Sequence, residues 1–205
     1  MRTALLTILA CALLVSLGQV RDPEIEFRQI AGLLKLADGM TVADVGAGGG
    51  TWTARLAEKV GPRGRAYGTD VRPTLVHGIE SSAKARGLTN VTAVLGTQDD
   101  MGLPPGCCEA MLLRLAYHAF DNPARMREGL QRAMTPKGRV LIIDFRPPLD
   151  QLTGEMKSIG FGRIEFIERW QGQDGVYAAL FEKLRPSLAT RRGGGRTIRY
   201  RLYRQ

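Results

Sequence analysis

The chain has 205 residues, a length that suits one domain. Apolar residues make up 44% of it, and glycine and proline are too few to indicate a disordered or fibrous chain. The net charge of +9 is unevenly placed, because seven arginines and no acid lie in residues 185–205. The rest of the chain therefore carries a net charge of only +2, and the composition excludes a protein that is basic throughout.

The three cysteines indicate neither a metal site nor a disulfide framework. They form no Cys-x-x-Cys motif and no cluster with histidine, so we expect no metal. Cys107 and Cys108 are adjacent, and neighbouring cysteines rarely bond to each other. We interpret the pair as small apolar residues in the structure.

The first twenty residues have the pattern of a secretory signal peptide. One arginine precedes an apolar run from 4 to 15, and small residues follow at Ser16 and Gly18. The run is short for a membrane-spanning helix, so residues 1–20 are interpreted as a signal peptide or a marginal membrane anchor. This predicts an exported, periplasmic or membrane-tethered protein. The alternative is a cytoplasmic protein whose first helix packs on the domain.

From residue 22 onward, helices and strands are predicted to alternate. Asp22, Pro23 and Glu24 are typical of a helix start, since they supply a capping side chain, a first-turn proline and an acid near the positive helix end. That helix is expected to end near residue 38. Further helices are predicted at 52–60, 74–86, 124–134 and 149–159. Strands are predicted at 41–45, 65–69, 91–95, 110–115, 139–143, 163–168 and 176–183.

This alternation predicts an α/β domain over residues 22–184, with a mostly parallel sheet covered by helices on both faces. Only a polar turn separates the last two strands, so they are expected to form an antiparallel hairpin at the sheet edge. Residues 185–205 are interpreted as a basic, flexible tail. The alternation of Ile198, Tyr200 and Leu202 with arginines leaves a further strand as the alternative.

A glycine-rich turn follows the first predicted strand. Gly46, Gly48 and Gly50 alternate there, as is typical where a strand turns sharply into a helix and a ligand approaches the backbone. Asp44 stands just before the first glycine and suits a cationic ligand, since it would repel a pyrophosphate. Asp70 ends the next strand, where a carboxylate accepts hydrogen bonds from ribose hydroxyls.

With these two acids, the motifs taken in order resemble the class I S-adenosylmethionine-dependent methyltransferases. The resemblance covers residues 26–183 and rests on VADVGAGGG, GTD, LGTQDDMGLPP, LLRLAYHAF, MTPKGRVLIIDF and the terminal hairpin GFGRIEFIERW with VYAALFEK. It implies a Rossmann-like, seven-stranded, mostly parallel sheet with an antiparallel terminal hairpin. It also implies S-adenosyl-L-methionine as the cofactor and methyl transfer as the reaction, with a small-molecule acceptor.

The resemblance assigns a role to each cofactor-binding position. Asp44, Gly46, Gly48 and Gly50 would hold the methionine part, and Asp70 the ribose. Val71 would pack on the adenine, while Asp99 or Asp100 would bind its amino group with Met101 nearby. Residues 114–117 would border the methyl group.

Tyr117 and His118 are the candidate catalytic residues, because they lie where the acceptor would approach. His118 is a candidate general base, needed only if the acceptor must lose a proton. The alternative is that Tyr117 and His118 cap the strand and line the pocket. Ala119 replaces a second histidine that some members of the family carry, which weakens a histidine mechanism.

Three other functions remain as alternatives. A nicotinamide-dependent oxidoreductase shares the glycine turn and the acid on the second strand. A nucleic-acid-associated methyltransferase would use the arginine-rich tail, since arginines attract phosphates, although a solubilising or membrane-surface tail is the simpler interpretation. A non-catalytic domain would keep the fold and bind the cofactor without turnover. Membrane contact through residues 1–20 is a further expected interaction.

Overall fold

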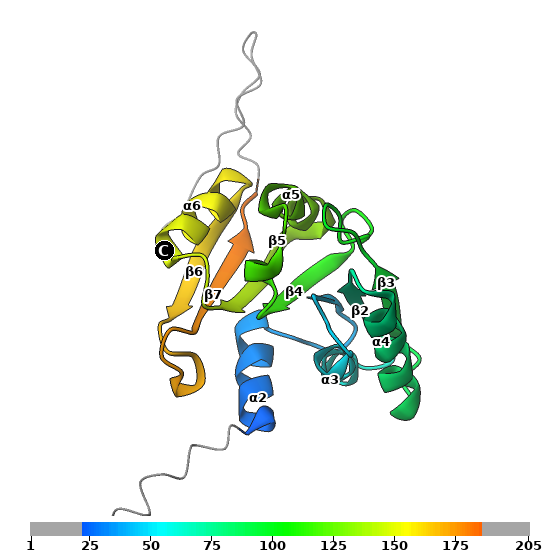
Figure 1. The fold of residues 1–205 in the computed structure, drawn as a ribbon. Helices are drawn as coiled ribbons and strands as arrows, with labels where there is room; N and C mark the ends of the chain where they lie inside the picture. The colour runs from blue at the N-terminus through cyan, green and yellow to red at the C-terminus, as the bar shows by residue number, and fades with distance from the viewer. Residues whose placement is uncertain (1–21, 186–205) are drawn as a thin grey trace, which may run out of the picture.

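The computed structural model describes residues 22–185 and shows an α/β fold (Figure 1). The expected signal or anchor at 1–20 and the tail from 186 onward lie outside the described residues. Within 22–185, no helix is both long enough and apolar enough to cross a bilayer. The helices are α2 (Pro23–Leu34), α3 (Thr51–Val60), α4 (Pro73–Ala85), α5 (Pro123–Ala133) and α6 (Leu149–Ser158), with short 3₁₀ turns η1 (Tyr117–Ala119) and η2 (Trp170–Gly172).

Seven strands form one sheet in the order β3-β2-β1-β4-β5-β7-β6. They are β1 (Thr41–Val45), β2 (Arg65–Asp70), β3 (Val91–Leu95), β4 (Cys108–Arg114), β5 (Met134–Asp144), β6 (Phe161–Ile167) and β7 (Tyr177–Lys183). The pairs among β1 to β5 are parallel, whereas β7 runs antiparallel to both β5 and β6. The predicted fold class and the hairpin at the edge are confirmed, with β7 inserted between β5 and β6.

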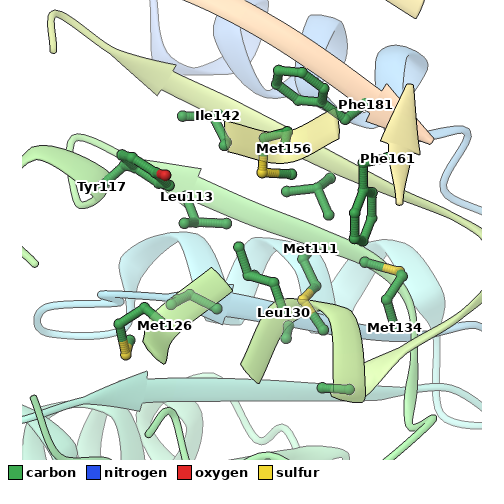
Figure 2. Close-up of a cluster of buried hydrophobic side chains, with 14 of the residues drawn as sticks. Met111, Leu113, Tyr117, Met126, Leu130, Met134, Ile142, Met156, Phe161 and Phe181 are labelled. Atoms are coloured by element: carbon green, nitrogen blue, oxygen red, sulfur yellow. The ribbon is translucent and has the colours of Figure 1, made fainter. Parts of the chain in front are cut away.

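Helices cover both faces of the sheet, as predicted. On one face α5 and α6 bury an apolar cluster that includes Leu130, Met156 and Phe181 (Figure 2). On the other face α2 and α3 pack on a second cluster that includes Ile30 and Leu56, and α4 packs beside α3 on β2 and β3. The two layers bury both faces of the central strands, which explains their near-continuous apolar sequence.

The β6–β7 connection is more than the polar turn predicted from the sequence. It contains η2, in which Trp170 is completely buried on the α2 side of the sheet. The Trp170 indole N–H donates to Glu26 Oε1 at 2.8 Å, and Glu26 is only 3% exposed. This hydrogen bond holds the hairpin tip against α2, although the two residues are 144 positions apart in the sequence. No local sequence pattern predicts such a contact.

β4 and β5 both begin earlier than predicted, and their pairing is irregular near these first residues. Cys108 pairs with Met134, but the next pair is Ala110 with Arg139, so residues 135–138 leave the ladder. Pro136 lies in this segment and has no N–H to donate to a neighbouring strand. The apolar pattern of 139–143 therefore marked only the regular part of β5.

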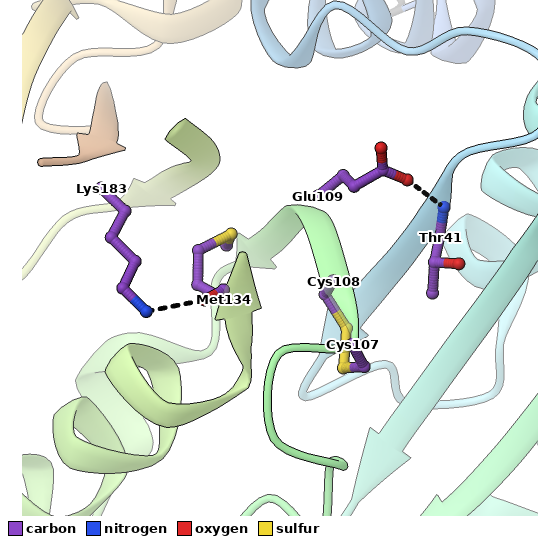
Figure 3. Close-up of a disulfide and its surroundings, with 6 residues drawn as sticks. All are labelled: Thr41, Cys107, Cys108, Glu109, Met134 and Lys183. Carbon is purple, nitrogen blue, oxygen red and sulfur yellow. Dashed lines mark hydrogen bonds between the residues drawn. A yellow bond between two sulfur atoms is a disulfide. The ribbon is translucent and has the colours of Figure 1, made fainter. Parts of the chain in front are cut away.

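The expectation that Cys107 and Cys108 do not pair is wrong, because the structure joins them by a disulfide (Figure 3). Cys107 precedes β4 and Cys108 opens it, at the point where the strand register shifts. Regular alternation of side chains has not yet begun there, so the two thiols reach each other. The pair lies at the start of β4, whereas the features described below lie at the opposite, carboxyl ends of the strands.

Candidate functional site

A cleft of about 250 Å³ opens at the carboxyl ends of the central strands. Its walls come from the ends of β1 and β2, the loop after β3 and the turn η1 after β4. Of the predicted cofactor residues, Gly46, Asp70, Val71 and Met101 line this cleft. In open α/β sheets, ligands bind in the crevice outside the carboxyl ends of the strands, so the cleft is where the topology predicts one.

The glycine turn after β1 is held by backbone contacts that a larger residue would prevent. Gly46 has φ +73°, and a Cβ atom there would lie 2.5 Å from the Cβ atom of Ala116, the residue just before η1. Gly50 has φ +83° at the N-terminus of α3, where a Cβ atom would lie 2.7 Å from Ile79 Cα. Both positions therefore require glycine, because φ is positive and because a Cβ atom would clash with a neighbouring residue. The turn accordingly packs closely against the wall of the cleft.

Asp44 lies under the glycine turn as a buried acid with no cation directly on it. It is 2% exposed, and its Oδ2 accepts a hydrogen bond of 2.7 Å from the Thr53 hydroxyl. Burial raises the pKa of Asp44 to about 6, although the Thr53 hydrogen bonds and the Arg114 charge oppose the rise. Within residues 22–185, no cationic nitrogen lies within 4.0 Å of Asp44. A positively charged ligand nearby would compensate this charge.

Asp70 ties two loops together at the lip of the cleft. Its Oδ2 accepts from the Gly48 N–H at 3.1 Å, and its Oδ1 accepts from the Arg72 N–H at 3.0 Å. Asp70 is 9% exposed, whereas the adjacent Val71 is 40% exposed and offers an apolar surface to the cleft. A carboxylate and an apolar side chain therefore lie next to each other at the lip of the cleft.

Asp99 and Asp100, predicted to meet the adenine, have their carboxylates engaged elsewhere. Asp99 Oδ1 accepts from the Asn122 amide at 2.8 Å, and Asp100 accepts two hydrogen bonds from Arg132 at 2.8 and 2.9 Å. Neither lines the cleft. The loop instead presents Thr97 and Gln98 there, together with Met101, so Met101 alone of the three residues predicted from this loop lines the cleft.

Arg114, expected beside the methyl group, points to the other face of the sheet. Its guanidinium binds both oxygens of Glu26 at 2.8 and 3.0 Å and lies over the Trp52 ring, 4.8 Å from the centroid. The residues of this segment that do border the cleft are Leu115 and Ala116. Arg114 therefore belongs to the contacts that hold α2 against the sheet.

Tyr117 lies in η1 with its hydroxyl already bonded. The hydroxyl donates to Glu155 Oε2 at 2.8 Å and accepts from Arg127 at 3.1 Å, and Arg127 pairs with Glu155 at 3.0 Å. Burial raises the pKa of Tyr117 above its ordinary value, so the hydroxyl stays protonated. The arrangement favours Tyr117 as a wall residue and leaves it no basic function.

His118 is held by Asp144, an acid that was not among the residues predicted from the sequence. Its Nδ1 lies 2.9 and 3.1 Å from the two carboxylate oxygens of Asp144, which is completely buried at the end of β5. The Phe145 ring packs on the imidazole with centroids 4.4 Å apart. The available signal was Asp144 directly after an apolar strand, the placement that also identified Asp44 and Asp70.

A second pocket of about 550 Å³ lies beyond η1, and Tyr117, His118 and Phe145 are among its walls. Phe120 lines both this pocket and the cleft, so the two spaces adjoin at that ring. The cleft is lined by Asp70, with Asp44 buried behind the glycine turn, and the second pocket by an imidazole that Asp144 holds. The two adjoining spaces give room for two ligands.

Comparison with known proteins decides the family. Residues 36–179 match the family described as Methyltransferase domain, which covers more than half of the chain. The chain belongs to this methyltransferase family. The resemblance stated from the motifs is thereby confirmed, and with it S-adenosylmethionine as the family's cofactor. The match also decides against the nicotinamide-dependent oxidoreductase.

Solved structures agree with the methyltransferase fold. A SAM-dependent methyltransferase from Aquifex aeolicus has a TM-score of 0.67 and 22% identity, covering 76% of this chain and 88% of that one. The YcgJ protein of Bacillus subtilis has a TM-score of 0.63 and 15% identity, covering 78% and 98%. At these identities the likeness shows the fold alone.

Curated relatives of the methyltransferase are named demethylmenaquinone methyltransferase. The protein of that name from Geobacillus stearothermophilus is 26% identical over 115 residues, which is 56% of this chain and 49% of the relative. The one from Listeria welshimeri is 22% identical over 116 residues, covering 57% and 49%. The chain thus spans about half the length of the curated relatives it matches.

Proposed function

We propose that the protein transfers a methyl group from S-adenosylmethionine to a small organic acceptor. The cofactor is assigned to the cleft at the strand ends and the acceptor to the second pocket. The single observation that carries the proposal is the junction at Phe120, which lines both spaces. The name of the curated relatives supports an acceptor of the quinone type.

The residues around the cleft fit this cofactor. Asp44 supplies a buried negative charge below the glycine turn, which suits an ammonium group. Asp70 presents carboxylate oxygens at the lip for ribose hydroxyls, and Val71 and Met101 offer apolar surface for a base. Gln98 lines the cleft after β3, and its amide suits the polar edge of an adenine.

When bound, the cofactor supplies an activated methyl group on a positively charged sulfur, so the protein's principal task is to align the two reactants. The glycine turn and η1 set the cofactor side of the junction. Tyr117, fixed by Glu155 and Arg127, keeps η1 in place. His118 and Phe145 border the acceptor side.

Calorimetric titration with S-adenosylhomocysteine and with NADH tests the cofactor assignment. We expect a dissociation constant in the micromolar range for the first and no binding of the second. As a control for substitutions of acids in the cleft, Asp174→Asn should leave the dissociation constant unchanged. That acid is 86% exposed and, among the described residues, pairs only with Arg169 on the β6–β7 connection. Binding of NADH without S-adenosylhomocysteine would refute the proposal.

A further inference from the structure

Beyond the proposed function, on which this step rests, we infer that Asp144 holds His118 in the tautomer whose free Nε2 takes a proton from an aromatic hydroxyl group in the second pocket. Asp144 is a positioning residue, and His118 is the catalytic base. The methyl acceptor is accordingly a phenol-type compound, which for an acceptor of the quinone type is the reduced hydroquinone form, and it reacts through oxygen or through the ring that the oxygen activates.

The hydrogen bonds around Asp144 decide the tautomer. Its carboxylate accepts from the Phe145 backbone N–H at 2.8 Å and from the His118 backbone N–H at 3.2 Å, in addition to the imidazole. An ionised carboxylate can only accept hydrogen bonds, so the imidazole nitrogen that faces it, Nδ1, carries the proton. The lone pair of the neutral ring is then on Nε2. In residues 22–185, Nε2 has no hydrogen-bond partner, and the His118 side chain is 29% exposed.

The surroundings of Nε2 suit a flat aromatic acceptor that carries a polar oxygen. Phe145 is 46% exposed yet packs on the imidazole, so its remaining face is open to the pocket. Phe120, Pro147 and Pro148 add apolar surface, and Arg146 and Gln151 add polar groups to the same pocket. The carboxylate of Glu155, also in the pocket, is neutralised by Arg127, which leaves no unpaired acid to hold a cationic amine. Aromatic rings pack well against such walls.

As the hydroxyl proton moves to His118 Nε2, the electron pair on the acceptor oxygen, or on the ring carbon it activates, forms the new bond to the methyl carbon. The carbon–sulfur bond breaks, and its pair remains on a neutral thioether. With methylation on carbon, the ring carbon subsequently loses its proton to water and the ring regains its aromatic electrons. The proton on the imidazolium, which Asp144 stabilises by charge, is later released to water.

The tautomer can be measured without turnover. The chain has only two histidines, His77 and His118, so long-range ¹H–¹⁵N spectra of the full-length protein bound to S-adenosylhomocysteine contain two imidazole patterns. His77→Gln removes one and assigns the other; His77 is 79% exposed on α4. We expect His118 to be protonated on Nδ1 in the neutral ring. Asp144→Asn, which places an amide donor against Nδ1, should move the proton to Nε2.

The acceptor class is tested with 4-nitrophenol, whose anion absorbs visible light. Added to the complex with S-adenosylhomocysteine, it should shift the His118 Nε2 resonance and gain phenolate absorbance over the same concentration free in solution. His118→Phe keeps an aromatic ring against Phe145 and should lose the absorbance gain while still binding S-adenosylhomocysteine. Asp144→Ala, checked for folding by its thermal transition, should reduce the gain at least tenfold.

The outcomes separate the two hypotheses. Loss of S-adenosylhomocysteine binding in the wild type would refute the proposed function. Two results would overturn the present inference alone, each with normal S-adenosylhomocysteine binding. One is a neutral His118 ring with its proton on Nε2, and the other is a His118 resonance that does not respond to 4-nitrophenol. A tautomer unchanged in Asp144→Asn would show that Asp144 is structural only.

Discussion

The Asp44→Asn substitution should stabilise the cofactor-free protein and weaken cofactor binding at the same time. Burial raises the pKa of Asp44 from 3.8 to about 6, and one unit corresponds to about 1.4 kcal/mol. The folded state therefore carries a cost of about 3 kcal/mol for holding this acid ionised at pH 8. Asparagine removes the charge but gives up one hydrogen bond to Thr53, worth about 1 kcal/mol. The net expected gain in the free energy of unfolding is about 2 kcal/mol.

The sign of this effect depends on pH. The pKa of Asp44 is raised in the folded state, so the protonated acid makes its full contribution to the free energy of unfolding below pH 3.8. This contribution is lost as the pH rises through about 6. The variant should therefore be the more stable protein at pH 8 and the slightly less stable one near pH 4. Urea unfolding of both proteins without cofactor, at several pH values, measures the difference.

The same substitution should weaken S-adenosylhomocysteine binding by about 1.5–3 kcal/mol, since a hydrogen bond between charged groups is lost. Asp174→Asn, on an exposed acid, should change neither quantity. Destabilisation of Asp44→Asn at pH 8, or a stability difference that does not vary with pH, would refute the electrostatic account of this site.

The remaining predictions concern the same cleft. Wild-type affinity for S-adenosylhomocysteine should fall about tenfold per pH unit below pH 6, where Asp44 protonates; a calorimetric pH series shows this, and an equal slope in Asp44→Asn would contradict it. Asp70→Asn should weaken binding by about 1–3 kcal/mol through lost buried hydrogen bonds, and an unaltered dissociation constant would count against the lip assignment. Gln98→Ala should weaken binding, whereas Asp99→Ala should leave it within about twofold, because only Gln98 lines the cleft; the reverse order would restore the sequence prediction. Deleting residues 186–205 should leave affinity unchanged, and a weaker complex would show that the tail takes part.

The fold could be predicted from the sequence because its signals are local. Asp22 caps α2 as expected, because its Oδ1 accepts a hydrogen bond of 2.8 Å from the Glu24 N–H. The turn after β1 requires glycines at the positions where the sequence has them. The apolar runs of β1 and β5 could be recognised because a buried parallel strand is apolar on both sides. Such signals lie within one element and its immediate neighbours.

Residues whose partners lie far away in the sequence were missed or misplaced. Glu26 looks like a first-turn acid on α2, yet it accepts from Arg114 and from Trp170 and is buried. Asp144 lies 26 residues from His118, and only the fold brings them together. The sequence could not show which side chain of the loop around Asp99 faces the cleft. That orientation depends on contacts with distant residues, such as the hydrogen bond between Asp99 and Asn122.

Acids lie at the ends of three strands, and their positions correspond to where the positive charge is before and after the proposed reaction. Asp44 and Asp70 end or nearly end β1 and β2 beside the cleft, and Asp144 ends β5 beside the second pocket. At the start of the step the positive charge is on the sulfur, on the cofactor side of Phe120. Once the methyl group and the proton have moved, the charge is on the His118 imidazole, on the acceptor side. A positive charge in a poorly hydrated site is costly unless an anion is close. Under the proposal an acid lies on each side of Phe120, Asp70 at the cleft and Asp144 against His118, so no acid has to move as the charge passes from one side to the other.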